Sequence, residues 1–125
     1  MIVLDASAWV DVLTAGLQAD EHLRDGVIVP PHFDAEVVGT IRALSQRSLI
    51  DRVAADQAVR RHLAAPFTRL FEPVDVVAAW QWRESMSFTD AWYAALASRL
   101  DVAWVTADQR AGRTARALGV DVEIV

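Results

Sequence analysis

The chain has 125 residues, a net charge of −5 and a hydrophobic content of 54%, the composition of a folded protein with one core in a single domain, residues 1–125. It contains no cysteine, which excludes disulfides and thiolate metal sites. All 12 positions that carry lysine or arginine are arginine, which excludes lysine chemistry such as a P-loop or a Schiff base. The acidic balance disfavours a broad nucleic-acid surface, so a nucleic-acid enzyme of this charge would need metal cations or local arginines. No stretch has the length of a membrane helix, so a cytoplasmic location without a membrane partner is expected.

Short runs typical of strands alternate with segments in which apolar residues recur three and four positions apart, the spacing of a helix. This helical spacing is clear at Val37, Ile41 and Leu44. Pro30 separates one such helix from the strand before it, and Gly119 ends the last helix. The alternation predicts an α/β fold, a parallel sheet with helices on both faces. In chain order, the predicted strands are 2–4, 27–29, 69–73, 102–106 and 122–125.

Four acidic residues lie near the ends of these elements. Asp5 directly follows the first strand, and Asp108 comes two residues after the fourth. Glu36 lies in the first turns of the helix after the second strand, and Asp90 opens the helix before the fourth. In open α/β sheets, sites form beyond the carboxyl ends of the strands. We therefore expect these carboxylates, from four distant segments, to converge at one end of the sheet.

Each acid also has a purely structural interpretation, in which it stabilises the start of a helix. Asp5 can cap the helix that follows it, for about 1 kcal/mol. The stretch SFTD at 87–90 matches the capping-box pattern, with Ser87 as the cap and Asp90 as its return partner. The stretch TADQ at 106–109 fits a similar box formed by Thr106 and Gln109. Glu36 is an acid that the helix dipole favours in a first turn.

Taken together, the acids point to a metal. Like charges gathered in one cleft raise one another's pKa unless a cation neutralises them. Hard divalent ions such as Mg²⁺ take oxygen ligands and need only one or two direct carboxylates. His22, His32 and His62 are too far apart in the sequence to suggest a zinc site. An all-carboxylate set therefore favours Mg²⁺ or Mn²⁺ over Zn²⁺.

Four stretches carry a resemblance to a known family. The sequence resembles the PIN-domain family, specifically the VapC ribonuclease toxins of bacterial toxin–antitoxin pairs. The similarity runs end to end and is least distinctive at 48–85, where only a helix, strand and helix pattern is shared. The motifs are IVLDASAWVD at 2–11, VPPHFDAEVVGTIRAL at 29–44, SFTDAWYAALASRL at 87–100 and WVTADQRAGRTARALGV at 104–120.

This resemblance implies a three-layer α/β/α domain whose central parallel sheet has about five strands in the order 3-2-1-4-5. It also implies an endoribonuclease that depends on Mg²⁺ or Mn²⁺ and cleaves single-stranded or loop RNA. As the toxin of a pair, such a protein would be inhibited by a cognate antitoxin and would form a homodimer.

The family's functional residues map onto this chain motif by motif. Asp5, Asp90 and Asp108 correspond to acids that would hold the metal. Ser7 and Thr106 take positions from which a hydroxyl would orient the carboxylates by hydrogen bonding. The implied catalytic set is Asp5, Glu36, Asp90 and Asp108.

The sequence does not decide the roles of several aromatic and basic residues. Trp92 stands where the family usually carries a smaller aliphatic residue, and it would either narrow the cleft or contact a partner. Most of the other tryptophans have the pattern of core or interface residues, and an exposed one would offer a base a surface to stack on. Arg110 and Arg113 follow Asp108 closely enough to lie at the rim of the cleft and to contact RNA.

Other classes of protein fit less well. Phosphatases of the haloacid-dehalogenase type and response-regulator receivers need a second acid near the first strand and a lysine, whereas this chain has Ser7 there and no lysine. Flap-type nucleases need a helical arch for which the chain has no residues to spare. The remaining alternative is a PIN-like scaffold of weak activity that binds a partner or operator DNA.

Overall fold

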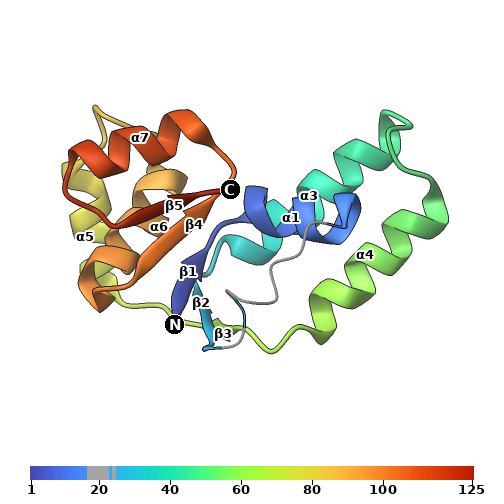
Figure 1. The fold of residues 1–125 in the computed structure, drawn as a ribbon, viewed down its shortest axis with the longest axis horizontal. Coiled ribbons are helices and arrows are strands. Elements are labelled where there is room, and N and C mark those ends of the chain that lie inside the picture. Colours follow the sequence, from blue (N-terminus) through green and yellow to red (C-terminus); the bar gives the residue numbers. More distant parts are fainter. Residues whose placement is uncertain (17–22, 24) are drawn as a thin grey trace.

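The computed structural model describes residues 1–16, Leu23 and 25–125, so His22 lies outside the described residues. A five-stranded parallel sheet with the order β3-β2-β1-β4-β5 lies at its centre (Figure 1). Both the α/β class and the order 3-2-1-4-5 are thereby confirmed. The strands are β1 (Ile2–Leu4), β2 (Val27–Val29), β3 (Thr68–Arg69), β4 (Ala103–Thr106) and β5 (Val122–Ile124).

The central strand β1 is paired on both sides and is fully buried. A parallel strand covered on both faces needs a continuous apolar run, which the residues IVL provide. Leu4 lies opposite Val105 of β4, and the backbone N–H of Asp5 donates to the carbonyl of Val105 at 3.2 Å. This register brings Asp5 level with Thr106 at the carboxyl ends of two neighbouring strands.

The prediction for the third strand was wrong in extent. A strand was expected at 69–73, whereas β3 contains only Thr68 and Arg69, both exposed at the edge of the sheet. The N–H of Leu70 still donates to the carbonyl of Val29 at 2.9 Å. Pro73 then opens a helix, a position that proline favours because its fixed φ suits the first turn.

Helices cover both faces of the sheet. On one side lie α1 and α3, with α4 packed against them, and on the other side lie α5, α6 and α7 (Figure 1). None of the helices in the described part of the chain is long and apolar enough to cross a bilayer. The helices are α1 (Ala6–Ala15), α3 (Phe33–Gln46), α4 (Arg52–Ala64), α5 (Pro73–Gln81), α6 (Phe88–Leu100) and α7 (Gln109–Ala117).

The helix starts at the candidate site follow the capping expectations with one exception. Asp5 caps α1 by accepting from the N–H of Ala8 at 3.0 Å, and Ser87 caps α6. The predicted capping box of Thr106 and Gln109 is wrong, because Thr106 belongs to β4 and Asp108 itself caps α7. Strand β4 ends at Thr106 and α7 begins at Gln109, so the Asp108 carboxylate lies at the start of α7.

A glycine holds α7 close to the sheet at this point. A Cβ on Gly112 would lie 2.8 Å from Cγ1 of Ile124 and 3.2 Å from Cγ2 of Thr106. Only a residue without a side chain allows this approach without displacing its neighbours. Gly112 thus fixes the distance between α7 and the strand that carries Thr106.

A polar network centred on the buried His62 ties α1, α3, α4 and β3 together. His62 is fully buried on α4, and its Nδ1 accepts from the indole N–H of Trp9 at 3.0 Å. Because indole is only a donor, the proton of the neutral ring lies on Nε2, which donates to Asp34 at 2.7 Å. Asp34 also accepts two bonds from the Arg69 guanidinium, at 2.6 and 2.7 Å. Hydrogen bonding from Arg69 is the main cause that lowers the pKa of Asp34.

Candidate active site

Asp5 is the most enclosed of the four acids, with 4% of its surface exposed. Its Oδ1 accepts from the Ser7 hydroxyl at 2.6 Å as well as from the cap N–H of Ala8, and its Oδ2 accepts a short bond from the Thr106 hydroxyl. The pKa of Asp5 is raised to about 6, mainly by burial; the charge of Asp90 acts in the same direction, and these hydrogen bonds oppose the rise. Ser7 and Thr106 therefore contact the carboxylate that they were predicted to orient.

The two hydroxyls also join the start of α1 to the segment after β4. The N–H of Ala107 donates to Ser7 Oγ at 3.1 Å, and the N–H of Asp108 donates to Thr106 Oγ1 at 3.0 Å. Each hydroxyl thus binds Asp5 on one side and the backbone leading to Asp108 on the other. The two acids are held by one shared set of hydrogen bonds.

Asp90 is the common neighbour of the other three acids. It lies in the first turn of α6, half-buried, and burial is the largest cause that raises its pKa. The charges of Asp108 and Glu36 raise the pKa of Asp90 further, and Asp90 in turn raises that of Asp5. Like charges act in this way only at short range. The acids from four separate segments therefore share one electrostatic environment.

Asp90 and Asp108 also line the same cavity. It has a volume of ≈ 290 Å³ and lies between the start of α6 and α7. Oδ1 of Asp108 caps α7 through the N–H of Ala111 at 3.0 Å, and the side chain of Asp108 is exposed. The structural and functional interpretations of Asp108 are therefore not alternatives, because its carboxylate caps α7 and also lines the cavity.

Glu36 is held by a hydrogen bond from Tyr93 and lies next to His32. The phenol of Tyr93 donates to Glu36 Oε1 at 2.7 Å, and His32 Nε2 lies 3.3 Å from the same oxygen. Burial, and then the charge of Glu36, raise the pKa of Tyr93 above its usual range, so the phenol stays protonated and keeps donating. Burial also lowers the pKa of His32. Within the described residues, Oε2 of Glu36 makes no hydrogen bond and is free to accept one.

Tyr93 and His32 were not among the predicted site residues, although the sequence held a signal for both. Tyr93 lies three residues after Asp90, and His32 lies four residues before Glu36. Such spacings bring side chains to the same face of a helix. Tyr93 lies in an apolar helical pattern, so the sequence indicated a core residue and not a hydrogen-bond donor in the site.

Replacing Tyr93 with phenylalanine is expected to lower the RNA cleavage that the family resemblance implies by roughly 10- to 100-fold, because the carboxylate of Glu36 loses the donor that orients it. The ring stays in the core, so the free energy of unfolding should fall by only about 1 kcal/mol. Steady-state cleavage assays and urea unfolding measure the two effects. Thr40→Val is the matched control, because the Thr40 hydroxyl binds the backbone carbonyl of Glu36 instead of its carboxylate. Equal cleavage rates for Tyr93→Phe and Thr40→Val would show that the Tyr93 hydroxyl has no role in the reaction.

The donor set suits a hard cation, although it does not form a closed metal cage. Among residues 1–16, Leu23 and 25–125, no three His, Asp or Glu side chains lie close enough together to hold one ion. Mg²⁺ needs only one or two direct carboxylates and keeps several waters, so an open set of acids is compatible with it. Burial is the main cause that raises the pKa of Asp5 and of Asp90, and the charges of neighbouring acids add to it: Asp90 for Asp5, and Asp108 and Glu36 for Asp90. A bound cation would relieve this repulsion.

Trp92 does not line the cavity. Its ring packs against His32, Phe71 and Phe88, with centroids 5.0, 6.2 and 5.6 Å away. Trp9 and Trp104 are buried, as their patterns predict. Trp80 instead is 56% exposed, with the Arg83 guanidinium 4.7 Å from its ring centroid.

The chain is similar to proteins of one family. The family model described as PIN domain matches residues 2–117. Ribonuclease VapC12 of Mycobacterium tuberculosis is 38% identical over 128 residues, covering 99% of this chain and 97% of that protein. The crystal structure of PAE2754 from Pyrobaculum aerophilum has a TM-score of 0.72 at 21% identity, covering 90% of this chain and 84% of that one. The crystal structure of Mycobacterium tuberculosis VapC20, titled a sarcin-ricin loop cleaving toxin, has a TM-score of 0.61 at 20% identity and covers 96% of each chain.

The match to the family model, the near-complete coverage of the relatives and the strand order of the sheet all indicate the same family. The chain therefore belongs to the PIN-domain family, among its VapC-type members.

Proposed function

We propose that this chain is an endoribonuclease that depends on Mg²⁺ or Mn²⁺, cleaves single-stranded or loop RNA, and acts as the toxin of a toxin–antitoxin pair. The observation that carries the proposal is the electrostatic coupling of Asp5, Glu36 and Asp108 with the same residue, Asp90. A protein gains nothing in stability from carboxylates that repel one another, so such a set is typical of a functional site. The name ribonuclease, borne by a relative with 38% identity, supports RNA as the substrate.

In this proposal Asp5, Asp90 and Asp108 hold the metal, directly or through water. When bound, the metal ion neutralises charge on the phosphate and lowers the pKa of a water molecule. The hydrogen bonds from Ser7 and Thr106 keep the Asp5 carboxylate aimed into the site. These bonds reduce the reorganisation that substrate binding requires.

Glu36 orients the attacking water and accepts its proton in the proposed reaction. Tyr93 occupies Oε1, which leaves Oε2 to face the water. The water oxygen attacks phosphorus in line with the bond to the 3′ oxygen; that bond breaks, and the departing 3′ oxygen takes a proton from solvent water. The products are a 5′-phosphate on one fragment and a 3′-hydroxyl on the other.

Several partners belong to the same proposal. We propose a cognate antitoxin that blocks the site, and its contact surface should carry basic residues to complement the net charge of −5. A homodimer and a cytoplasmic location are also proposed, on the resemblance to toxins of this type.

The direct test is incubation of the purified protein with single-stranded and structured RNA in EDTA, in Mg²⁺ and in Mn²⁺. Cleavage should occur with either metal and stop with the chelator, and sequencing of the fragment ends should find 5′-phosphates at the cut positions. RNA that stays intact under all conditions, together with tight binding of a partner protein or operator DNA, would favour the scaffold of weak activity.

A further inference from the structure

The cavity beside Asp90 and Asp108 also contains a basic side chain that has no partner. Arg110, from the first turn of α7, lines it together with Thr114 on the same face of the helix. Within the described part of the chain, the Arg110 guanidinium makes no hydrogen bond and no ion pair. Most arginines at the surface stay solvated, but this one lines a defined cavity together with Asp90 and Asp108.

We propose that this cavity is a subsite for one RNA phosphate and that Arg110 binds it. The inference rests on the proposed function, because it places a neighbouring phosphate of the same strand next to the scissile one. The phosphate in this subsite is one that is not cleaved.

The charge around the cavity supports this assignment. A substrate phosphate that approaches Asp90 and Asp108 is repelled by both, and the chain as a whole is acidic. The free Arg110 guanidinium, which lines the same cavity, supplies attraction next to these acids. Its planar fork of donors matches two phosphate oxygens at once, which a lysine ammonium cannot do.

The size and the other lining groups fit the same ligand. A volume of ≈ 290 Å³ is at the lower end for ligand sites, so the cavity suits part of one nucleotide instead of a whole strand. Ser85, Ser87 and Thr114 bring hydroxyl groups to its wall. Hydroxyl groups are frequent partners of phosphate and sugar oxygens in nucleic-acid complexes.

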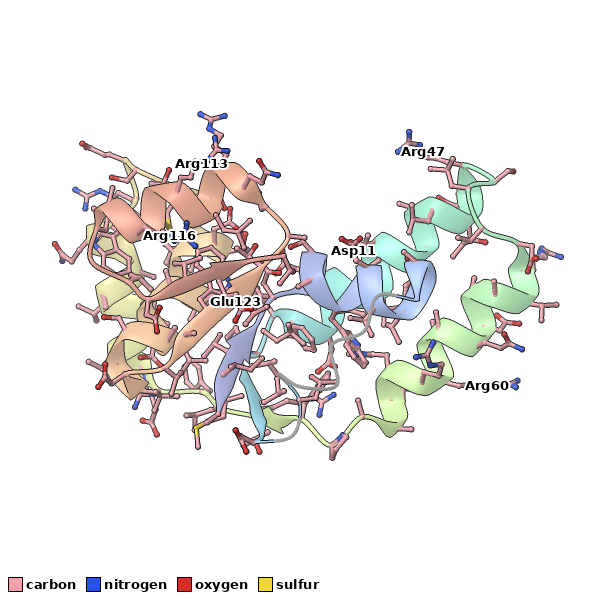
Figure 2. All side chains as sticks on the ribbon, in the orientation of Figure 1. Asp11, Arg47, Arg60, Arg113, Arg116 and Glu123 are labelled. Atoms are coloured by element: carbon pink, nitrogen blue, oxygen red, sulfur yellow. The ribbon has the colours of Figure 1, made fainter. Side chains whose placement is uncertain are left out.

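Arg113 provides a matched control on the same helix. It does not line the cavity, its side chain donates to Gln109 at 3.1 Å, and Figure 2 shows it extending outward from α7. Arg110→Ala and Arg113→Ala remove the same charge from positions three residues apart. Any general effect of net charge is therefore equal in the two variants.

The first experiment compares kcat and KM of wild type, Arg110→Ala, Arg110→Lys and Arg113→Ala. The substrate is a short single-stranded RNA that contains the cut sequence mapped by end sequencing. Arg110→Ala should raise KM roughly tenfold or more, because a charge-assisted hydrogen bond is lost, with a smaller effect on kcat. Arg110→Lys should lie between wild type and Arg110→Ala, and Arg113→Ala should match wild type. Melting curves confirm that each variant is folded.

A second experiment locates the phosphate. Each phosphate near the cut is replaced in turn by an uncharged methylphosphonate. In wild type, one replacement next to the scissile bond should raise KM, and in Arg110→Ala the same replacement should have no further effect. Binding of the RNA in EDTA, followed by fluorescence anisotropy, gives a readout without cleavage. The slope of the logarithm of the binding constant against the logarithm of salt concentration should be shallower by about 0.7 in Arg110→Ala than in wild type.

The outcomes separate this inference from the proposed function. Equal KM, equal salt slope and equal methylphosphonate effects in Arg110→Ala and Arg113→Ala would overturn the subsite while the protein still cleaves RNA. A wild-type protein that neither cleaves nor binds RNA would overturn both.

Discussion

Asp5→Asn and Asp90→Asn are each expected to lower RNA cleavage by roughly 100-fold or more, while the protein stays folded. Both substitutions remove a charged oxygen that we assign to the metal, and both keep the shape of the side chain. Asparagine remains a good helix cap, so the start of α1 is preserved in Asp5→Asn. The new amide can donate to Thr106 Oγ1, which has acceptor lone pairs available.

The stability of these variants follows from the pKa of Asp5, which burial raises from 3.8 to about 6. Between these two pH values the folded protein binds more protons than the unfolded chain, so rising pH destabilises wild type across this window. Above pH 6 the cost of the buried charge is fully present. In EDTA, Asp5→Asn should therefore exceed wild type in free energy of unfolding by on the order of 1–3 kcal/mol at pH 7.5, and the advantage should shrink towards pH 4.

Urea unfolding at several pH values measures this advantage, and gel assays measure cleavage. Asp56→Asn makes the same chemical change at an exposed position on α4 and should alter neither quantity. If the unfolding free energy of Asp5→Asn fell in proportion to its activity at every pH, the carboxylate would serve only as a helix cap.

The second large effect concerns stability alone. His62→Ala is expected to lower the free energy of unfolding by about 3–5 kcal/mol, because a fully buried ring is removed and the indole N–H of Trp9 loses its acceptor. Asp34 loses a hydrogen bond at the same time. A loss of this size is a large share of the 5–15 kcal/mol typical of a domain.

His62→Gln keeps the measurement possible if His62→Ala does not fold, because the amide can accept from Trp9 and donate to Asp34. Its loss should be clearly smaller than that of His62→Ala. The control is Leu63→Ala, which changes the next residue, 70% exposed, and should cost at most about 0.5 kcal/mol. Circular dichroism during urea unfolding gives all three values. Losses of equal size at positions 62 and 63 would show that the network contributes nothing.

The sequence predicted those parts of the fold that depend on local patterns. The strands with β-branched runs, such as Val27–Val29, were located correctly, and so were the caps at Asp5 and Ser87. The short edge strand β3 was placed too late, because two exposed residues show no apolar pattern. The local pattern around Thr106 suggested only a capping box, because its contact with Asp5 spans 101 positions; the family resemblance, and not the pattern, predicted its role beside the carboxylate.

The same limit applies to the site. Asp5 and Asp108 could be placed together because the carboxyl ends of neighbouring parallel strands meet at one edge. The Tyr93 bond to Glu36 spans 57 positions and joins two helices, so only their packing reveals it. The choice between Arg110 and Arg113 likewise depends on the face of α7 that the cavity meets.

The central claim is that Asp5, Asp90 and Asp108 hold a divalent cation. Calorimetric titration of Mn²⁺ into the protein, after dialysis against EDTA and then metal-free buffer, tests this claim most directly. We predict saturable binding to wild type and to Asp56→Asn, and affinity at least about tenfold weaker for Asp5→Asn and Asp90→Asn. No bound Mn²⁺ in wild type, or equal affinity in all four proteins, would contradict the claim.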